Sequence, residues 1–497
     1  MIKKCVVVGG GTAGWMTAAL MAKLLGNKIT IELVESEDIG IVGVGEATIP
    51  PIQNVNRVLG IDEAEFLRET NATIKLAIRF ENWRVPGERY FHTFGTSGQG
   101  LAFCPFHHFW TRAQQLGYTS NLWDYDLNYL CCDEGKFAKL ETKNKDFELP
   151  YAYHFDSSLY GAFLRKYSEK MGVTRTEGLI EHAVIDHDSG HIKSLKLKNG
   201  KEVHGDLFVD CSGARGLLIN KYLGTGYEDW SHWLPCDTAI AVPSERFENT
   251  LPYTRAIAHQ AGWQWRIPLQ HRNGNGLVYC SRYYSDDEAS NLLLNNLDST
   301  AIGDPRIIRF RTGRTRKQWN RNVVAIGLSS GFLEPLESTS IYLIQSAIVR
   351  LIHLFPHEAV TRALQEEYNR QSKLEYELIR DFIILHYHVN ERDDHQFWRD
   401  VRRMDVPERL RHRIDLFKEN GSIFQDQLDI FLEPSWLQVM VGQGLMPKDY
   451  HPLANSLSEQ QLVDMLARTK KTKREPLPHI HPHDHFLDLF CNAKKAS

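Results

Sequence analysis

Apolar positions near the start of the chain form two short runs, separated by a glycine-rich turn and a helical pattern. Residues 5–8 are apolar, residues 9–14 follow the pattern G-x-G-x-x-G, and mostly apolar residues continue through 15–20. A short apolar run bounded by glycines predicts a buried strand, and we expect a helix directly after the turn. A second apolar run at 29–34 predicts the next strand, which ends at Glu35.

The order strand, glycine turn, helix, strand and acid is typical of a dinucleotide-binding unit. The first glycine allows a tight turn, the second lets the backbone approach a pyrophosphate, and the third lets the helix pack closely on the strand. The pyrophosphate then lies at a helix N-terminus, where N–H groups and the helix dipole favour negative charge. The acid at the end of the second strand is expected to bind the ribose hydroxyls. The predicted cofactor-binding residues of this unit are Gly9, Gly11, Thr12, Ala13, Gly14 and Glu35.

Further along the chain, two more apolar runs end in turns of small residues. Residues 207–209 run into Asp210 and a serine-glycine turn, and residues 323–326 run into Gly327. Turns of this kind present backbone amides to a bound cofactor or anion. Because several strand ends far apart in the sequence are involved, we expect FAD rather than the smaller NAD. A glycine-rich stretch at 40–51, which contains Gly45, Glu46 and Ala47, is expected to lie flat against the same ligand.

The middle and the second half of the chain have different patterns. Residues 85–150 are rich in aromatic and turn residues without a helical or strand period, and we interpret them as an excursion onto a substrate face. Trp263 and Trp265 lie two apart on an extended segment, so both indoles point to one face, although paired tryptophans can equally be core residues. After about residue 350 the pattern becomes helical. We therefore predict a core at 1–350 and a helical, substrate-side subdomain at 351–497.

Composition and charge narrow the function classes. The 497 residues exceed the usual size of a single core. Lys and Arg number 58 against 62 Asp and Glu, which gives no basic stripe for nucleic acid. The eight cysteines show no C-x-x-C spacing, no apolar run reaches 18 residues, and the first strand begins within a few residues. We therefore expect reduced thiols, a cytoplasmic location and no membrane span.

Alternating histidines near the end of the chain offer a possible metal site. His479, His481, His483 and His485 are interrupted by prolines. Because prolines break this segment, a solvated tail is the favoured interpretation, and we predict no bound metal.

Five motifs together carry a resemblance to a known family. They are the turn at 9–14, the stretch at 43–48, Lys75 at the start of 75–83, the W-x-W-x-I-P motif at 263–268, and the segment 332–339. Together these motifs resemble those of the flavin-dependent halogenases of the tryptophan-halogenase type, from the N-terminus to about residue 420. The resemblance implies an α/β fold with an FAD-binding, Rossmann-like domain of the flavin monooxygenase type and a mostly helical substrate-side subdomain.

The resemblance also implies a mechanism with two separate sites. Reduced FAD (FADH2) and oxygen convert chloride or bromide to hypohalous acid, which passes through the protein to an aromatic, indole-type substrate. A separate flavin reductase supplies the FADH2, since no NAD(P)H site is evident. The residues Trp263, Trp265, Ile267 and Pro268 then form a barrier between flavin and substrate.

Individual roles follow from the same resemblance. Lys75 matches the catalytic lysine, and Glu337 matches the essential acid, which accepts the ring proton. Halide binding is expected at Thr339 and Ser340, where the family usually has glycine at the second position. This difference leads to the hypothesis that bromide is preferred over chloride. A second pair, His92 and Phe94, matches the residues that stack against the substrate ring.

Two questions stay open from the sequence. After residue 420 the residues with which relatives grip free tryptophan are absent, which favours indole, a substituted indole or an aromatic group on a larger molecule. The alternatives to a halogenase are a flavin-dependent aromatic hydroxylase and a non-catalytic flavoprotein. The hydroxylase leaves Lys75 and the tryptophan pair unexplained, and the non-catalytic flavoprotein needs only the glycine motifs.

Overall fold

The computed structural model describes residues 1–26, 28–39, 45–140 and 142–492, which divide into two compact units. Unit 1 consists of Met1–Ala72, Phe155–Asp237 and Ile308–Glu377, and unit 2 of Thr73–His154, Thr238–Ile307 and Leu378–Ser497. The units interleave along the sequence, whereas the predicted division at residue 350 is contiguous. That division stays a prediction about which parts bind flavin and substrate.

Unit 1 contains a six-stranded, mainly parallel sheet and the helices that cover it. Its elements are β1 Lys4–Val8, α1 Thr12–Leu25, β2 Thr30–Glu35, β3 Gly45–Ala47, α2 Ile52–Leu59, α3 Glu63–Glu69, α6 Ser157–Lys170, β8 Thr174–Glu177, β9 Ile180–Ile185, β10 Ile192–Leu197, β11 Glu202–His204, β12 Leu207–Asp210, β13 Tyr227–Asp229, β19 Gly313–Thr315, β20 Trp319–Asn320, β21 Val323–Ala325, β22 Gly331–Phe332 and α8 Ser340–His353.

The large sheet of unit 1 has the strand order β20-β21-β12-β1-β2-β8. The strand β1 lies in the middle and pairs in parallel with β12 and with β2, while β12 pairs in parallel with β21. The sequence runs predicted at 29–34, 207–210 and 323–326 therefore lie in one parallel sheet with β1, the first on one side of β1 and the other two on its other side, and their carboxyl ends lie at one edge of the sheet. In an open parallel sheet this edge is where ligands bind.

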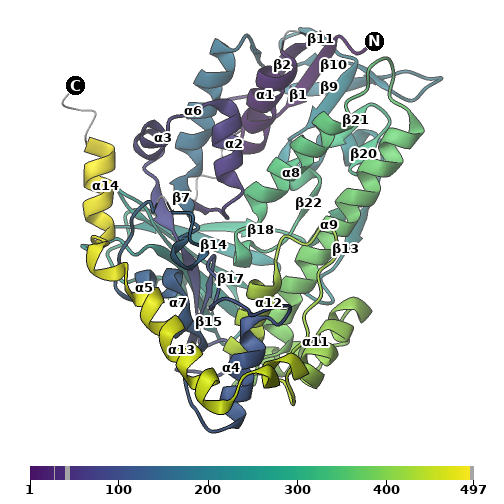
Figure 1. Ribbon diagram of the computed structural model, residues 1–497. Helices are drawn as coiled ribbons and strands as arrows, with labels where there is room; N and C mark the ends of the chain where they lie inside the picture. The colour runs from purple at the N-terminus through teal and green to yellow at the C-terminus, as the bar shows by residue number, and fades with distance from the viewer. Residues whose placement is uncertain (27, 40–44, 141, 493–497) are drawn as a thin grey trace. The chain divides into compact units, whose positions relative to one another are not determined.

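The helix α1 is buried along most of its length, from Gly14 to Ala22. It packs against α6, α8 and α2 as well as against β1 and β2, and Figure 1 shows it beside α2 and α6. On the opposite face of the sheet, Val6, Val8 and Phe208 belong to a hydrophobic cluster that includes residues of the small sheet β11-β10-β9. Both faces of the parallel strands are thus covered, which explains their continuous apolar runs.

Unit 2 combines an antiparallel sheet with most of the helices of the second half of the chain. Its elements are β4 Thr73–Lys75, β5 Ala77–Glu81, β6 Arg89–Thr93, α4 Phe106–Gln115, α5 Leu127–Asp133, β14 Thr238–Ser244, β15 Tyr253–His259, β16 Gly262–Pro268, β17 Asn273–Tyr279, α7 Asp286–Asn295, α10 Gln396–Arg403, α11 Glu408–Asn420, α12 Glu433–Gly442, α13 Glu459–Arg474 and α14 His483–Asn492. Three elements contain a change of unit along the chain, namely β7 Ala152–Asp156, β18 Arg306–Arg309 and α9 Arg362–His388.

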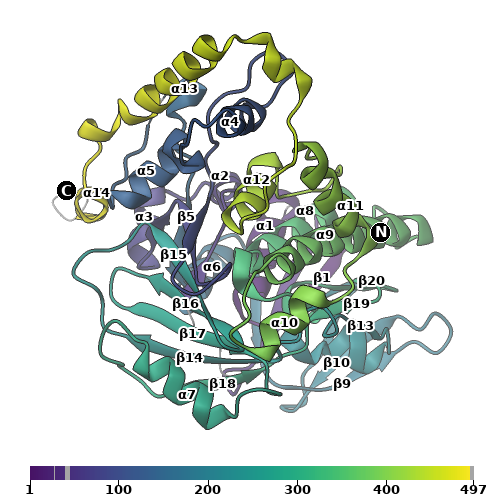
Figure 2. The same ribbon diagram turned by 90° about the horizontal axis from the view of Figure 1, so that it is seen from below.

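The large sheet of unit 2 has seven strands in the order β18-β14-β17-β16-β15-β5-β6, with β15 and β5 parallel. Figure 2 shows β14 to β17 side by side, with α7 next to β14. Ala289 and Leu293 of α7 belong to a hydrophobic cluster with Leu277 and Tyr279 of β17. This helix therefore covers one face of the sheet and leaves the opposite face for other contacts.

The structure confirms the helical character predicted after residue 350 but contradicts the absence of periodic structure at 85–150. That stretch contains β6, α4 and α5. The helix α4 is the instructive case, because the consecutive residues from Phe106 to Thr111 are all buried. These first six residues of the helix have no exposed side, so a 3.6-residue period of polar and apolar positions cannot be seen among them.

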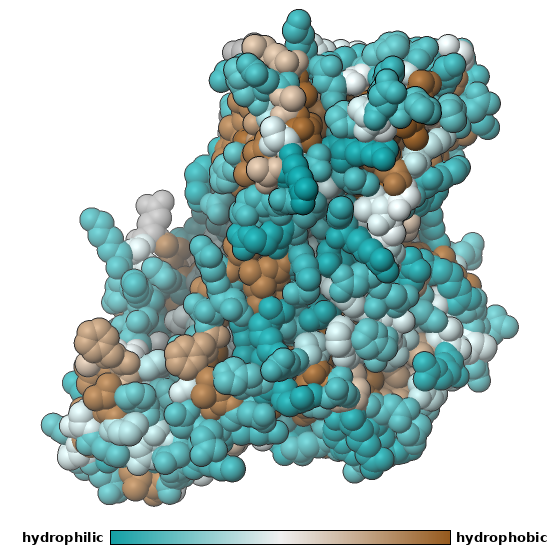
Figure 3. All heavy atoms as spheres, turned by 90° about the vertical axis from the view of Figure 1, so that its right-hand side faces the viewer, coloured by the Kyte–Doolittle hydropathy of each residue, from teal (hydrophilic) through white to brown (hydrophobic). Residues whose placement is uncertain are grey.

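The exposed apolar residues are scattered. The face shown in Figure 3 is mainly hydrophilic, with apolar side chains in separate small groups, an arrangement that is normal for protein surfaces. Among the residues that the structure describes, no helix has the length and apolar character needed to cross a membrane.

Candidate functional site

The glycine turn after β1 has the geometry that its sequence predicts. Gly9 has φ +112°, which favours glycine, and a Cβ at that position would collide with the carbonyl of Cys211. A Cβ at Gly14 would collide with the carbonyl of Gly9, so the helix can approach the strand only with glycine there. At Gly11, in contrast, a Cβ would meet no described atom within 4 Å. The backbone at Gly11 is therefore open on the side from which a pyrophosphate can approach.

The residues Thr12 and Ala13 open helix α1 directly after this turn. Gly327, in the turn after β21, has φ +77°, and a Cβ there would lie 2.8 Å from the side chain of Ala13. The structure thus brings the first and third predicted cofactor turns together. Within the described residues no side chain caps the N-terminus of α1, which leaves its amides available to an anion.

The acid at the end of β2 already has a protein partner. Arg175 donates from Nε to Oε1 of Glu35 at 2.6 Å, and Arg165 lies 3.8 Å from the same oxygen. Glu35 also sits against Gly10, where a Cβ would overlap the carboxylate. The carboxylate is therefore fixed next to the glycine turn, at the position where a ribose is expected.

The second predicted acid, Asp210, is fully buried at the end of β12. Its carboxylate accepts hydrogen bonds from the backbone N–H groups of Ser212, Leu218 and Ile219 at 2.7–3.0 Å. Burial raises the pKa of Asp210, although these hydrogen bonds oppose the effect. Its side chain thereby shapes the turn that follows β12, a role that the sequence pattern did not indicate.

The glycine-rich stretch is described only in part. Residues 40–44 lie outside the described residues, whereas Gly45, Glu46 and Ala47 form the short strand β3. Burial raises the pKa of Glu46 from 4.5 to about 7. A carboxyl group in this condition can hold or release a proton near neutral pH.

The predicted halide and acid residues lie on a short segment before α8. Glu337 and Thr339 are buried, and Ser340 is the first residue of α8. Ser338 between them has φ +58°, which turns the chain sharply into the helix. Within the described part of the chain no side chain caps α8, so its first amides can accept an anion.

In unit 2, Trp263 and Trp265 lie on one face of β16, as predicted. Their ring centroids are 6.1 Å apart, and Trp263 also lies 6.5 Å from Trp83. Trp265 packs across β17 at Gly276, where a Cβ would overlap the indole ring. The predicted partners Ile267 and Pro268 complete the same buried strand.

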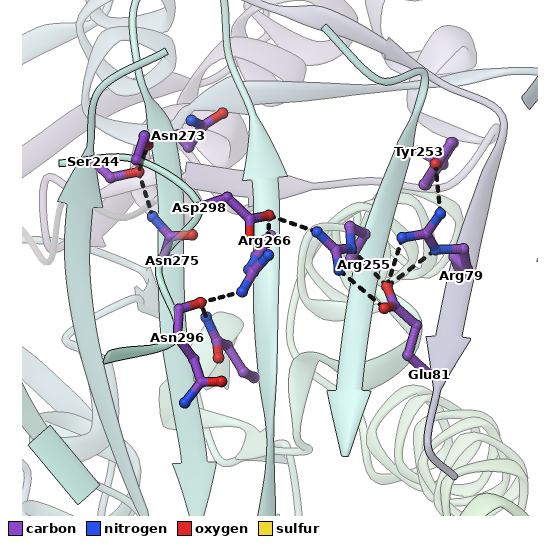
Figure 4. Close-up of polar contacts among 12 residues, drawn as sticks. Arg79, Glu81, Ser244, Tyr253, Arg255, Arg266, Asn273, Asn275, Asn296 and Asp298 are labelled. Carbon is purple, nitrogen blue, oxygen red and sulfur yellow. Dashed lines mark hydrogen bonds and ion pairs between the residues drawn. The ribbon is translucent and has the colours of Figure 1, made fainter. Parts of the chain in front are cut away.

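The opposite face of this sheet carries a network of charges, shown in Figure 4. Arg255 and Arg266 are cross-strand neighbours, and both bind the carboxylate of Asp298, with Arg255 at 2.6 Å. Arg255 also binds Glu81 at 2.6 Å, and Glu81 contacts Arg79. Burial opposes the charge of Glu81, but the two arginines outweigh it and lower its pKa. The tryptophans are therefore backed by a fixed polar layer.

The lysine predicted to be catalytic is the last residue of β4 and is completely buried. The Nζ atom of Lys75 lies 5.2 Å from the ring centroid of Phe94, a cation–π distance. The backbone N–H of Phe94 donates to the carbonyl of Leu76 at 3.0 Å. The structure thus brings two predicted site residues into contact and places the lysine in the protein interior.

A hydrogen-bonded histidine lies on the same face of this small sheet as Lys75. His154 of β7 is opposite Thr73, with Nδ1 at 2.9 Å from the Thr73 hydroxyl and Nε2 at 2.9 Å from the Thr254 hydroxyl. The Thr73 hydroxyl donates to the carbonyl of Pro268 at 2.7 Å, so it accepts from Nδ1–H of the imidazole. Burial, with the charge of Lys75, holds the pKa of His154 well below its usual value. This neutral histidine was missed by sequence reasoning.

The other predicted substrate residue, His92, faces an aromatic group. Its ring lies 5.6 Å from that of Phe382 and 6.1 Å from that of Phe431, and these two phenylalanines stack at 3.9 Å. Phe382 lies on α9, nearly 300 positions from His92, and its helical surroundings contain no distinguishing motif. Only the fold could reveal this contact.

The interpretation of the histidines as a solvated tail is wrong for His483. That residue begins helix α14 and is 1% exposed, whereas His479, His481 and His485 are exposed. The prolines do interrupt the preceding segment, but they do not prevent the next helix from packing on the protein. Apolar contacts such as that of Phe486 with Phe137 hold helix α14 in place.

The fold of unit 1 and its glycine-lined turns define a dinucleotide-binding protein with a Rossmann-like sheet. The family model for tryptophan halogenase matches residues 4–459. The chain therefore belongs to the tryptophan halogenase family, whose members are flavin-dependent enzymes that halogenate aromatic compounds.

Individual relatives agree with this assignment. Tryptophan 7-halogenase RebH from Lentzea aerocolonigenes is 36% identical, over 97% of this chain and 98% of the relative. The solved structure of Xcc4156, a flavin-dependent halogenase from Xanthomonas campestris, matches with a TM-score of 0.96 and 46% identity over 99% of both chains. That of BrvH, a flavin-dependent halogenase from Brevundimonas sp. BAL3, matches with a TM-score of 0.95 and 42% identity over 99% of both chains.

Proposed function

We propose that this enzyme halogenates an indole-type aromatic compound with hypohalous acid that is delivered to Lys75. The observation that carries the proposal is the complete burial of the Lys75 side chain against the ring of Phe94. Burying an ammonium group costs free energy, so a lysine at such a position is retained for a chemical reason more often than a surface lysine.

The residues of unit 1 fit the binding of FAD. Gly11 leaves room for the pyrophosphate, the amides of Thr12 and Ala13 face it, and Glu35 lies where the ribose is expected. When bound as FADH2, the cofactor supplies two electrons that, with oxygen, a halide ion and a proton, yield FAD, hypohalous acid and water. We further propose that a separate flavin reductase supplies the FADH2.

The proposed role of Lys75 is to hold and polarise hypohalous acid next to the aromatic substrate. Its ammonium group donates a hydrogen bond to the acid, and the neutral amine can alternatively carry the halogen. The ring carbon then takes the halogen, the ring loses a proton, and the hydroxyl group of the acid leaves as water. Arginine at this position would keep the charge but could not form the neutral amine.

Glu337 is proposed to accept the proton that the ring loses. A buried carboxylate also stabilises the positive charge of the intermediate. The halide is proposed to bind at the amides of Thr339 and Ser340, at the N-terminus of α8, where the helix dipole favours an anion. We propose bromide as the preferred halide, because the side chain of Ser340 alters the size of this pocket.

The proposed substrate is an indole without a free amino-acid group. His92 and Phe94 supply the aromatic surface for its ring, together with the pair Phe382 and Phe431. The three acidic residues of the segment 425–436 already have protein partners. Asp426 and Asp429 both accept from Arg413 at 2.5–2.7 Å, and Glu433 lies 3.4 Å from Nδ1 of His107. Carboxylates that are already paired in this way are not available to bind the ammonium group of a free amino acid.

The direct test is mass spectrometry of an indole panel incubated with enzyme, FAD, a flavin reductase, NADH, oxygen and bromide. We expect one bromine to be added to an indole, with FADH2 oxidation in parallel. The variant Lys75→Ala should oxidise FADH2 at the wild-type rate without halogenating, and Lys75→Arg serves as its charge-matched control. Halogenation by Lys75→Ala at the wild-type rate would overturn the role of the lysine, and a hydroxylated product in the wild type would favour a hydroxylase.

A further inference from the structure

The strand that carries Lys75 has an open edge, and a histidine closes it. Among the described strands β4 pairs only with β7, where Ile74 lies opposite Tyr153, so its other edge has no strand partner. The backbone N–H of Ile74 donates to Nε2 of His483 at 3.1 Å. A buried N–H group needs an acceptor, and here an imidazole occupies the place of a further strand.

Both ring nitrogens of His483 are engaged. Nδ1 lies 2.9 Å from the carbonyl oxygen of Thr250, so it carries the hydrogen, and Nε2 offers the lone pair that Ile74 requires. Only the neutral form of the ring satisfies both contacts. Burial lowers the pKa of His483 from 6.5 to about 4, which keeps the ring neutral at physiological pH.

The helix that carries this histidine is fixed independently of β4. Asp484 accepts from the backbone N–H of Thr250 at 2.8 Å and from Arg246 at 2.7 Å. The ring of Phe486 packs edge-on against that of Phe137 at 4.7 Å. The imidazole is therefore held by its own helix, and its position determines where the backbone of Ile74 can lie.

We propose that His483 is a positioning residue for halogenation, which acts through the N–H of Ile74 to fix the adjacent Lys75. This inference rests on the proposed function of Lys75. Ile74 directly precedes the lysine, so a displacement of its backbone shifts the root of the lysine side chain. A misplacement of about 1 Å can reduce a rate about a hundredfold when the reacting group must meet a substrate in one orientation. Residue 483 lies beyond the residues 4–459 that the family model matches.

The test compares three variants of the full chain. His483→Leu removes both hydrogen bonds, and His483→Gln restores an acceptor near the position of Nε2. Phe486→Leu is the matched control, because it weakens the packing of the same helix without removing the bond to Ile74. Each protein is assayed for bromoindole formed per FADH2 oxidised, for kcat and KM with indole, and for deuterium uptake at 73–76.

We expect His483→Leu to lower the kcat for halogenation at least about tenfold, with FADH2 oxidation unchanged and faster exchange at Ile74. His483→Gln should recover most of the lost rate, and Phe486→Leu should lose thermal stability but keep the wild-type product per flavin. If His483 had only a structural role, His483→Leu and Phe486→Leu would lose the same fraction of the halogenation rate whenever their losses of thermal stability are equal. That result would overturn the inference. Full halogenation by His483→Leu would overturn it as well. If Lys75→Ala also halogenates normally, the proposed function fails instead.

Discussion

The hydroxyl group of Thr73 donates to the carbonyl oxygen of Pro268 over 2.7 Å. This bond joins the strand of Lys75 to the strand that carries Trp263 and Trp265. The same hydroxyl accepts from the ring of His154, so one atom connects three elements. The lysine and the indole pair are thus parts of one hydrogen-bonded framework within unit 2.

Replacing Thr73 with valine should weaken this framework. Valine keeps the shape but removes the hydroxyl that contacts the Pro268 carbonyl and Nδ1 of His154, and each unsatisfied buried group costs about 1–3 kcal/mol. We expect a lower free energy of unfolding in urea titrations and less halogenated product per flavin. Thr73→Ser keeps the hydroxyl and is the matched control. Equal product yield in the valine and serine variants would show that the bond does not affect chemistry.

Gly276 should not tolerate a side chain. Because a Cβ would overlap the indole of Trp265, Gly276→Ala must displace that ring or the strand beneath it. Overpacking of this kind costs about 1–3 kcal/mol, which thermal unfolding can measure. Gly161→Ala in α6, where a Cβ would meet no described atom within 4 Å, is the control and should be neutral or stabilising. Similar stability in both variants would contradict the packing seen here.

Removing the shared carboxylate of Asp298 should destabilise the face behind the tryptophans (Figure 4). The side chain of Arg266 is only 7% exposed and lies beside Arg255. The variant Asp298→Ala leaves these two positive charges next to each other and removes the carboxylate that both bind. We expect a loss of roughly 1–3 kcal/mol. Asp298→Asn retains an acceptor and should lose less. A titration in urea measures both, and an unchanged alanine variant would refute a supporting role.

Acidification should destabilise the protein partly through His483. Its pKa is about 4 in the folded chain and 6.5 in a model peptide, so the unfolded chain binds more protons between these values. Stability is therefore complete above pH 6.5 and falls by about 1.4 kcal/mol per pH unit as the pH drops toward 4.

The variant His483→Gln has no titrating ring at this position, so its stability should depend less on pH. Melting temperatures of both proteins at pH 7.5 and pH 5.5 check the sign. A wild-type protein that loses no more stability than His483→Gln would contradict a neutral buried ring. His154, also buried and neutral, is unchanged in the variant and adds the same dependence to both proteins.

The halide preference can be tested at Ser340. With equal concentrations of chloride and bromide, the wild type should form mainly brominated product. Ser340→Gly introduces the glycine that the family resemblance leads us to expect there, and it should raise the chlorinated share, since it removes a side chain beside the proposed anion site. Mass spectrometry counts both products, and dominant chlorination by the wild type would dispose of the hypothesis.

The glycine turn and the strands beside it could be predicted from the sequence, because their residues have few substitutes. Gly9 has a positive φ, and a Cβ at Gly14 would collide with the carbonyl of Gly9. Because only glycine fits at these two positions, the glycine pattern in the sequence predicts the turn. The faces of β16 followed from simple alternation. In such cases the local chemistry determines the local shape.

The contacts that surround Lys75 could not be predicted in the same way. His154 and Phe382 are joined to the site only by tertiary pairing, and each lies in a stretch whose pattern is ordinary. Helix α4 was missed because its first six residues are all buried, which hides its period. His483 was misjudged because prolines nearby favoured a loop, while the decisive hydrogen bond crosses 409 positions of chain.

That separation has a consequence for the newly made protein. At about 5–20 residues per second, ribosomes need on the order of tens of seconds to reach the histidine after they have passed Ile74. Throughout this interval the edge of β4 has no imidazole to accept its amide. If His483 positions Lys75 as proposed, a nascent chain completes its halogenating site only when synthesis reaches the helix at 483.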